Sequence, residues 1–415
     1  MSRSIILVTL ALMIISTILH MPVETQDILF GRVILQPIYN DFLQPLYNVI
    51  IRPDPRRIHE IWLNINAWNR FINGERTIIL PFMDYKPYID GYRLIAPPLH
   101  GFLVGIFIQT SLLFSNTRDP NILITICYIL QAISSTVCII LAINYLLKKI
   151  GKGLYPLMII TMLVYGVYNI EPFALLFIIL SMLNFLENKE NKAILYAGLA
   201  SSFSYFAFVL FGVMIFVALK RNLKYSHILS ILLPLIPYLL ILMVKPEYLG
   251  WVINSLISPV FNCSLYQFAS IKLGDEVMFR ISTGIWLTLL LIIYSIHPSE
   301  GDINKWPGYI AGLLTLMYTM HPQTVPQTLL LILPSLLLAM NKDSKNIFLL
   351  ILTEALNAMI ILLWFHAGFI ASYLSHIGIR VSSNPLSLDN PVQWIAQARN
   401  AILLVHSGLL ISENV

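Results

Sequence analysis

Residues 121–147 read NILITICYILQAISSTVCIILAINYLL, a run without a single Asp, Glu, Lys or Arg. About 20 predominantly apolar residues are needed for a helix to cross the hydrocarbon core of a bilayer, so this run predicts a membrane-spanning helix. The whole chain has the same character, because its 415 residues are 57% hydrophobic and only 11% charged. Soluble domains carry about 25% charged residues. The composition therefore predicts an integral membrane protein.

Further apolar runs of helical length follow along the chain. Residues 4–20 are interpreted as a retained first transmembrane helix, because no small-residue cleavage site follows them; a cleaved signal peptide is the alternative. The run 193–219 predicts either one tilted helix or a hairpin of two short ones. The remaining runs lie near 97–115, 154–169, 171–187, 226–244, 277–296, 308–320, 325–340, 346–366 and 395–412. Together they predict an all-α polytopic membrane protein, one domain over 1–415 with about 11–12 transmembrane helices.

Short Lys-rich loops indicate the orientation of these helices, because cytoplasmic loops are enriched in Lys and Arg. Such loops occur at 148–152, 187–192, 220–224 and 341–345. Their placement in the cytoplasm puts the N-terminus there too and leaves the long loop 21–120 outside. This assignment requires that 97–115 does not cross, so it is predicted as a re-entrant or interfacial helix before a transmembrane bundle over 121–415. The membrane would be the cell membrane in a prokaryote and the endoplasmic reticulum in a eukaryote.

The early polar loop holds most of the candidate site residues. Asp27 follows the first helix within a few residues, and Asp84 and Asp90 flank the turn at Lys86-Pro87-Tyr88. A carboxylate at the outer membrane surface can act as a general base on a hydroxyl or hold a divalent metal such as Mg²⁺ or Mn²⁺. A solvated loop carboxylate or a helix cap is the alternative for each of them.

Two short outer turns add further candidates. Glu171 lies in Tyr168-Asn169-Ile170-Glu171-Pro172, where an ionisable group at membrane depth indicates function and a capping carboxylate is an equal alternative. His321 and Gln323 lie in the turn that begins His321-Pro322-Gln323, and their side chains can bind a polar headgroup or a phosphate. A purely structural histidine is the alternative. Glu354, inside an apolar run, is expected to face other helices.

Several functional classes are excluded by what the sequence lacks. It contains no Gly-rich phosphate loop, no Gly-x-Ser-x-Gly, no His-Glu-x-x-His and no Cys-x-x-Cys. The basic residues are dispersed over short loops, which excludes a nucleic-acid partner. No soluble domain for a nucleotide or a sugar nucleotide is apparent. A donor substrate is therefore expected to be carried by a lipid, and no cofactor is indicated other than the divalent metal.

Several motifs occur in a characteristic order. An acidic residue follows the first helix (Asp27), and the long loop ends in Tyr92-Arg93-Leu94-Ile95-Ala96-Pro97-Pro98-Leu99. An outer turn reads Asn169-Ile170-Glu171, a later helix carries Ala197-Gly198-Leu199-Ala200, and His321-Pro322-Gln323 precedes a helix predicted to be broken at Pro334. This order resembles the GT-C superfamily of polytopic glycosyltransferases. The greatest similarity is to the glycosylphosphatidylinositol mannosyltransferase branch and the U subunit of the GPI transamidase.

The resemblance implies an inverting transfer of a mannose-like sugar from a polyprenyl-phosphate donor on the non-cytoplasmic face. It implies that Asp27 is the base on the acceptor hydroxyl and that Asp84, Asp90, Tyr92 and Arg93 lie on the substrate side. Catalytic relatives often carry an acidic residue where this chain has Gln131 and a lysine where it has Ser204-Tyr205. These departures keep two alternatives open. One is a non-catalytic subunit with membrane-protein partners, and the other is a transporter or flippase of a lipid-linked substrate.

Overall fold

The computed structural model describes residues 3–34, 97–115, 120–220, 225–244, 246–256, 263–298, 305–322, 324–339, 344–385 and 387–415, and every regular element in them is a helix. The α-helices are α1 (Arg3–Leu19), α2 (Val23–Phe30), α5 (Pro98–Ser115), α6 (Pro120–Ile150), α7 (Ile159–Tyr165), α8 (Glu171–Leu186), α9 (Glu190–Ser201), α10 (Ala207–Lys220), α11 (Tyr225–Val244), α12 (Glu247–Leu256), α13 (Gln267–Leu273), α14 (Asp275–Ser295), α15 (Trp306–Thr319), α16 (Leu329–Ala339), α17 (Ser344–Phe365), α18 (Ala367–His376) and α19 (Pro391–Asn414). Two 3₁₀ segments, η3 (Lys152–Met158) and η4 (Pro326–Thr328), precede α7 and α16. The all-helical class predicted from the apolar runs is confirmed for this part of the chain.

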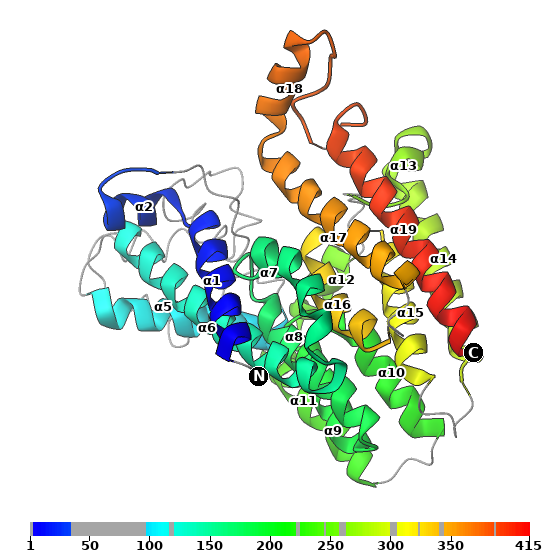
Figure 1. Cartoon of the computed structure of the whole chain (residues 1–415). Coiled ribbons are helices and arrows are strands. Elements are labelled where there is room, and N and C mark those ends of the chain that lie inside the picture. Colours follow the sequence, from blue (N-terminus) through cyan, green and yellow to red (C-terminus); the bar gives the residue numbers. More distant parts are fainter. Residues whose placement is uncertain are drawn as a thin grey trace.

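The chain enters the bundle through two helices joined at a sharp bend. α1 matches the predicted first helix, and α2 is turned by 106° from it. Pro22 precedes α2 and supports this break, because a proline cannot donate a backbone hydrogen bond to a continuing helix. α2 ends at Gly31, whose φ of 67° lies in the left-handed region that glycine adopts without a steric penalty. In Figure 1, α1 rises from the N-terminus and α2 lies beyond its upper end.

The run 193–219 forms a helical hairpin, one of the two predicted arrangements. α9 ends at Ser201, α10 begins at Ala207, and the two helices pack against each other. At about 1.5 Å per residue, neither helix is long enough to cross a bilayer core of about 30 Å by itself. A hairpin of two short helices is consistent with the predicted placement of the Lys-rich loops 187–192 and 220–224 on one side of the membrane.

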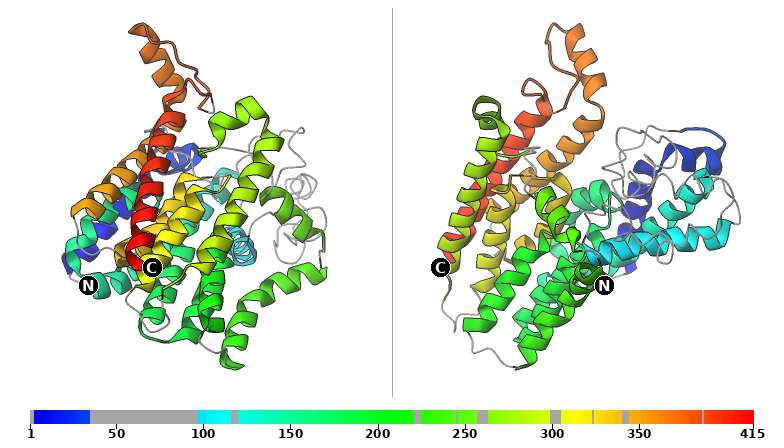
Figure 2. Two further views of the ribbon diagram at one scale, coloured as in Figure 1. Left: turned by 90° about the vertical axis from the view of Figure 1, so that its right-hand side faces the viewer. Right: turned by 180° about the vertical axis from the view of Figure 1, so that it is seen from behind.

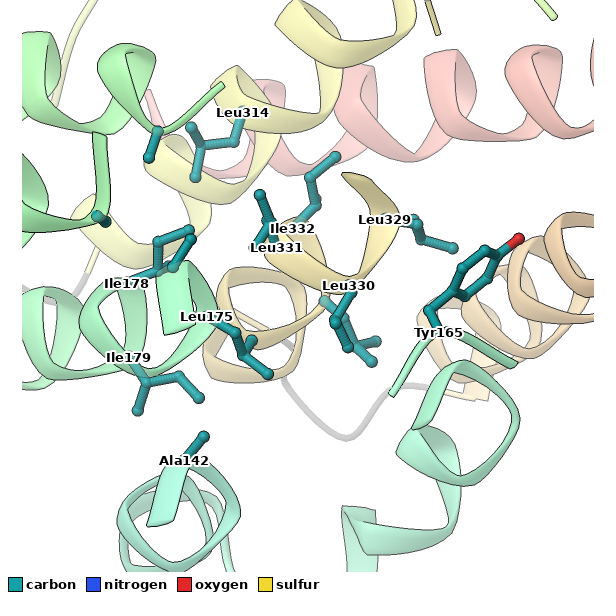
Figure 3. Packing of buried hydrophobic residues seen from close by; sticks show 14 of the residues in the cluster. Ala142, Tyr165, Leu175, Ile178, Ile179, Leu314, Leu329, Leu330, Leu331 and Ile332 are labelled. Carbon is teal, nitrogen blue, oxygen red and sulfur yellow. The ribbon is translucent and has the colours of Figure 1, made fainter. Parts of the chain in front are cut away.

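The core centres on α16, a helix that is apolar on every side. Its residues from Leu329 to Leu337 are all buried, as expected for a helix surrounded by other helices. Figure 3 shows this helix between side chains of α6, α7, α8 and α15, including Ala142, Tyr165 and Leu314. The predicted break at Pro334 does not occur, because α16 is continuous from Leu329 to Ala339 with the proline inside it.

The C-terminal helix lies along two others. α19 packs against α15 and α17, and Figure 2 shows it beside α15 over much of its length. Small residues allow the close approach to α15, because a Cβ atom at Gly312 would stand 3.1 Å from the backbone oxygen of Ser407. In Figure 1, α18 and α13 lie at the upper end of the molecule, whereas both chain termini lie in its lower half.

Within the described residues, four helices are long and apolar enough to cross a membrane by length and composition. They are the segments Asn121–Ile150, Tyr225–Met243, Ser344–Trp364 and Pro391–Asn414, and the bent pair of α1 and α2 makes a fifth if it counts as one span. This is fewer than the apolar runs predict. The physical reason is that the run 193–219 is divided into α9 and α10, and that other runs form helices too short to cross a bilayer, such as α8 with 16 residues. The described part of the chain is therefore all-helical and contains several candidate membrane spans.

Candidate functional site

The turn that joins α7 to α8 ends directly before Glu171 and is held by residues from two other segments. Gln131, in the middle of α6, donates from its side-chain amide to the carbonyls of Val167 and Asn169, both at 3.1 Å. His20, at the bend between α1 and α2, lies 2.8 Å from the carbonyl of Val164 through its Nε2 atom. These contacts hold the turn against α6 and against the bend between α1 and α2.

Asp27 lies on the exposed side of α2. The neighbouring Gln26 is buried, donates to the carbonyl of Met21 at 3.0 Å and accepts from the backbone amide of Ile34 at 2.8 Å. Thr25 is also buried and accepts a hydrogen bond from Thr125 of α6 at 3.2 Å. Buried polar contacts on one side of the short helix therefore leave the Asp27 carboxylate directed away from the bundle, where it is accessible.

Glu171 stands in the first turn of α8, followed by Pro172. Its side chain is half-buried, and the Asn169 side-chain amide lies 3.3 Å from Oε1. A carboxylate in the first helical turn is stabilised by the positive end of the helix dipole. The position therefore suits the helix-start interpretation, and the Oε2 atom of this carboxylate is buried.

Two more turns, at 263–266 and 324–326, are held through their carbonyl oxygens. Asn400 donates to the carbonyl of Cys263 at 2.7 Å, and Gln397 donates to that of Ser264 at 2.6 Å. Asn357 donates to the carbonyl of Pro326 at 2.9 Å, and Tyr318 donates to that of Val325 at 3.1 Å. With Arg399, these side chains of α15, α17 and α19 form a set that we call the carbonyl clamp: Tyr318, Asn357, Gln397, Arg399 and Asn400.

Arg399 is the centre of the carbonyl clamp and is fully buried. Its guanidinium donates to Asn357 Oδ1 at 2.7 Å and to Asn400 Oδ1 at 2.8 and 3.0 Å. Longer contacts reach the carbonyls of Cys263 at 3.4 Å and Thr324 at 3.5 Å, and the Tyr318 ring lies 5.4 Å from the guanidinium carbon. All of these hydrogen-bond acceptors are neutral, so the positive charge is stabilised by dipoles and a ring face.

Cys263 has an unusual backbone conformation within this arrangement. Its φ of 55° lies in the left-handed region, which non-glycine residues seldom adopt without support from their surroundings. Burial raises the pKa of its thiol to about 11, and the positive charge of Arg399 opposes that rise. The clamp thus supports a strained turn whose thiol is inaccessible.

His321 lies in the turn that precedes η4. Its side chain is half-buried and meets the indole ring of Trp286 edge-on, with 5.8 Å between ring centroids. Its carbonyl accepts from Thr324 Oγ1 at 3.2 Å. The clamp contacts to Thr324, Val325 and Pro326 follow directly in the chain, so the position of His321 depends on them.

The other predicted site residues, Asp84, Asp90, Tyr92, Arg93 and Gln323, lie outside the described residues. Within the described ranges, no group of three or more His, Cys, Asp or Glu side chains is arranged to hold a metal ion. The expectation of Mg²⁺ or Mn²⁺ therefore stays with the early loop. Glu354 is almost fully buried and accepts from Thr161 Oγ1 at 3.0 Å, which confirms that it faces other helices.

The carbonyl clamp was not predicted from the sequence. Arg399 lies inside the apolar run 395–412, and an ionisable residue within such a run is itself a signal of function. Asn357 and Asn400 carry no comparable signal, because a single amide in an apolar helix is common and its partners are far away in the chain. No family model, curated protein or solved structure matches the chain, so comparison with known proteins does not identify functional residues.

Proposed function

We propose that this protein is a membrane glycosyltransferase of the GT-C type. It would transfer a mannose-like sugar from a polyprenyl-phosphate donor to a hydroxyl acceptor on the non-cytoplasmic face. The proposal includes the predicted number of about 11–12 transmembrane helices, which is larger than the number of candidate spans in the described residues. Its partners would be the lipid-linked donor and the surrounding membrane lipids.

The observation that carries the proposal is the exposed carboxylate of Asp27 on α2. The same short helix exposes the apolar side chains of Val23, Ile28, Leu29 and Phe30. Exposed apolar side chains beside a carboxylate suit a helix that lies in the interfacial region of a bilayer. The sugar phosphate of a polyprenyl donor must also lie in this interfacial region, because the hydrocarbon chain of the donor is dissolved in the bilayer.

The chemistry requires one proton acceptor and one leaving group. Asp27 would take the proton from the acceptor hydroxyl while the hydroxyl oxygen attacks the anomeric carbon of the donor sugar. The bond between that carbon and the phosphate oxygen breaks, and the polyprenyl phosphate leaves with the electron pair. Attack on the face opposite the leaving group inverts the anomeric configuration.

Replacement of Asp27 by Asn tests this role. A general base contributes about 10²–10⁴-fold to a rate, so we expect Asp27→Asn to lower transfer from a radiolabelled polyprenyl-phosphate mannose by that factor in proteoliposomes. Because Asp27 is exposed, the unfolding temperature should not change.

Glu24 provides the matched control, since it is a second carboxylate on α2, one turn earlier and half-buried. Glu24→Gln should leave the transfer rate nearly unchanged. A wild-type rate in the Asp27→Asn variant would remove Asp27 from the mechanism and would contradict the proposal as stated.

Gln131 favours a second candidate, a non-catalytic subunit of the same fold. Its side-chain amide is used to hold the carbonyls of Val167 and Asn169, at the position where catalytic relatives carry an acid. This candidate predicts that the wild-type protein binds polyprenyl-phosphate sugar in a filter-binding assay but transfers none of it to any lipid or glycan acceptor. Measurable transfer by the purified protein would exclude it.

A further inference from the structure

We infer that Arg399 and Asn400 are positioning residues that hold the outer turns 263–266 and 324–326 in the arrangement that receives the lipid-linked donor. This inference rests on the proposed function for the identity of the ligand. The clamp itself rests on contacts alone. Its residues come from three helices, and its acceptors are consecutive carbonyls in the two turns.

The contacts link three outer turns through one residue, Asn357. Its side chain accepts from Arg399 at 2.7 Å and donates to the carbonyl of Pro326 at 2.9 Å. Its own backbone carbonyl accepts from Tyr165 Oη at 2.7 Å. Tyr165 is the last residue of α7, immediately before the turn that leads to Glu171. The clamp therefore joins the end of α7 to the turn at 324–326, which follows His321, and to the strained Cys263.

Stability alone is a poor explanation for a buried arginine. Removal of a charge from water is costly, and apolar replacements of buried charged groups are often neutral or stabilising. Arg399 lies eight residues after the start of α19, which corresponds to about 12 Å along the helix from its outer end. A guanidinium at this depth has five donors in a fixed plane, so it can define the relative placement of several acceptors at once.

Direct binding of a donor phosphate by Arg399 is not supported by the geometry. The side chain is fully buried, and its nitrogen atoms are used by Asn357, Asn400 and the two turns. Its effect on a ligand must pass through the backbone that it holds. The exposed Val325 belongs to one of those turns, and the half-buried His321 lies three residues before that turn; both can meet a ligand at the outer surface.

Cys263 provides a native reporter of the clamp. The full-length protein in nanodiscs would be treated with a maleimide, and the rate at each cysteine would be read from peptide masses. Cys127 and Cys138 of α6 are also buried and serve as internal references. We expect Arg399→Met to raise the labelling rate of Cys263 at least about tenfold, because an exposed thiol has a lower pKa and a larger thiolate fraction.

If the inference is wrong, the labelling rate of Cys263 should not rise and should instead fall. If Cys263 stayed buried without Arg399, its thiol would lose the nearby positive charge, its pKa would rise above about 11, and labelling would slow. Unchanged or slower labelling of Cys263 would overturn the inference. Equal acceleration at Cys127 and Cys138 would do so as well, because it would indicate general unfolding.

Asn400→Asp is the second variant, in case Arg399→Met does not fold. The aspartate keeps an oxygen acceptor for Arg399 and loses the donor to the Cys263 carbonyl. We expect faster labelling of Cys263 with no decrease in unfolding temperature. Ser407→Ala is the matched control on the same helix face, since Ser407 Oγ donates only to the carbonyl of Leu404 at 2.8 Å. It should leave the labelling unchanged.

The transfer assay separates positioning from folding. We expect Asn400→Asp to raise the KM for the polyprenyl-phosphate sugar about tenfold and to leave kcat within about twofold, because binding geometry is changed and the base is not. A fall in kcat with unchanged KM would overturn the donor-positioning role. If the wild-type protein transfers no sugar, the proposed function fails, and the clamp is judged by the labelling of Cys263 alone.

Discussion

Gly312 of α15 lies so close to Ile411 of α19 that a Cβ atom at residue 312 would stand 2.7 Å from Ile411 Cγ1. The same atom would be 3.1 Å from the backbone oxygen of Ser407 and 3.2 Å from the backbone nitrogen of Ile411. Backbone atoms cannot rotate aside, so the two helices would have to separate. The contact joins the helix that carries Arg399 to the helix that carries Tyr318.

Gly312→Ala should therefore lower the stability of the protein by about 1–3 kcal/mol, the usual cost of added volume in a tightly packed interior. The measurement is the unfolding temperature in detergent. Gly308→Ala is the control, because the three atoms nearest to a Cβ there all belong to the side-chain amide of Asn414, which can turn away. Equal losses in the two variants would contradict this account of the α15–α19 contact.

The buried carboxyl of Glu354 should tolerate an amide better than an apolar side chain. Gln at this position can still accept the hydrogen bond from Thr161, whereas Leu leaves that hydroxyl unpaired, at a cost of about 1–3 kcal/mol. We expect the order of unfolding temperatures to be wild type, then Glu354→Gln, then Glu354→Leu. Thr161→Val should remove most of the difference between the last two, and additive effects would contradict the pairing.

The protein should lose stability at high pH partly through Tyr248. Burial raises the pKa of this phenol to about 12, and its hydrogen bond with Tyr205 opposes the rise. Between pH 10 and pH 12 the unfolded chain releases the phenolic proton and the folded protein keeps it, so unfolding becomes more favourable by up to about 1.4 kcal/mol per pH unit. Tyr248→Phe should flatten the decline of unfolding temperature above pH 10. Tyr225→Phe, at an exposed site, should not.

The orientation predicted from the Lys-rich loops can be tested with single cysteines. Lys189 and Ser383 are both exposed, and they lie in loops predicted to be on opposite sides of the membrane. In intact cells, a membrane-impermeant maleimide should label Ser383→Cys and should label Lys189→Cys only after permeabilisation. The reverse pattern would invert the orientation and would place Asp27 in the cytoplasm. The three native cysteines are buried, so they contribute little background.

Much of the helical framework could be predicted from apolar runs. The run 121–147 becomes α6, and 346–366 becomes α17, each within a few residues of its predicted ends. The run 193–219 could not be resolved from sequence, because its composition suits one long helix as well as a hairpin. The break after Ser201 is stabilised from outside by Tyr238, which donates to the Ser201 carbonyl at 2.7 Å.

Less of the candidate site could be predicted. Asp27 and Glu171 were singled out because carboxylates are scarce at the ends of apolar runs. The structure exposes Asp27 on the short helix α2 and places the half-buried Glu171 at the start of α8. From the sequence, Gln131 drew attention only because catalytic relatives often carry an acidic residue at this position. Its contacts with Val167 and Asn169 depend on the packing of α6 against the turn before α8, which no local pattern reports.

The sequence by itself determined the class of this protein, the positions of most helices and the scarcity of charge in them. The physical reason is that helix formation in an apolar solvent depends on composition over about 20 neighbouring residues. Only the tertiary structure decided how the buried polar groups pair. Arg399 meets residues 42, 75 and 136 positions away in the chain, and such pairing depends on how helices pack, since each buried polar group needs a partner that only packing can supply.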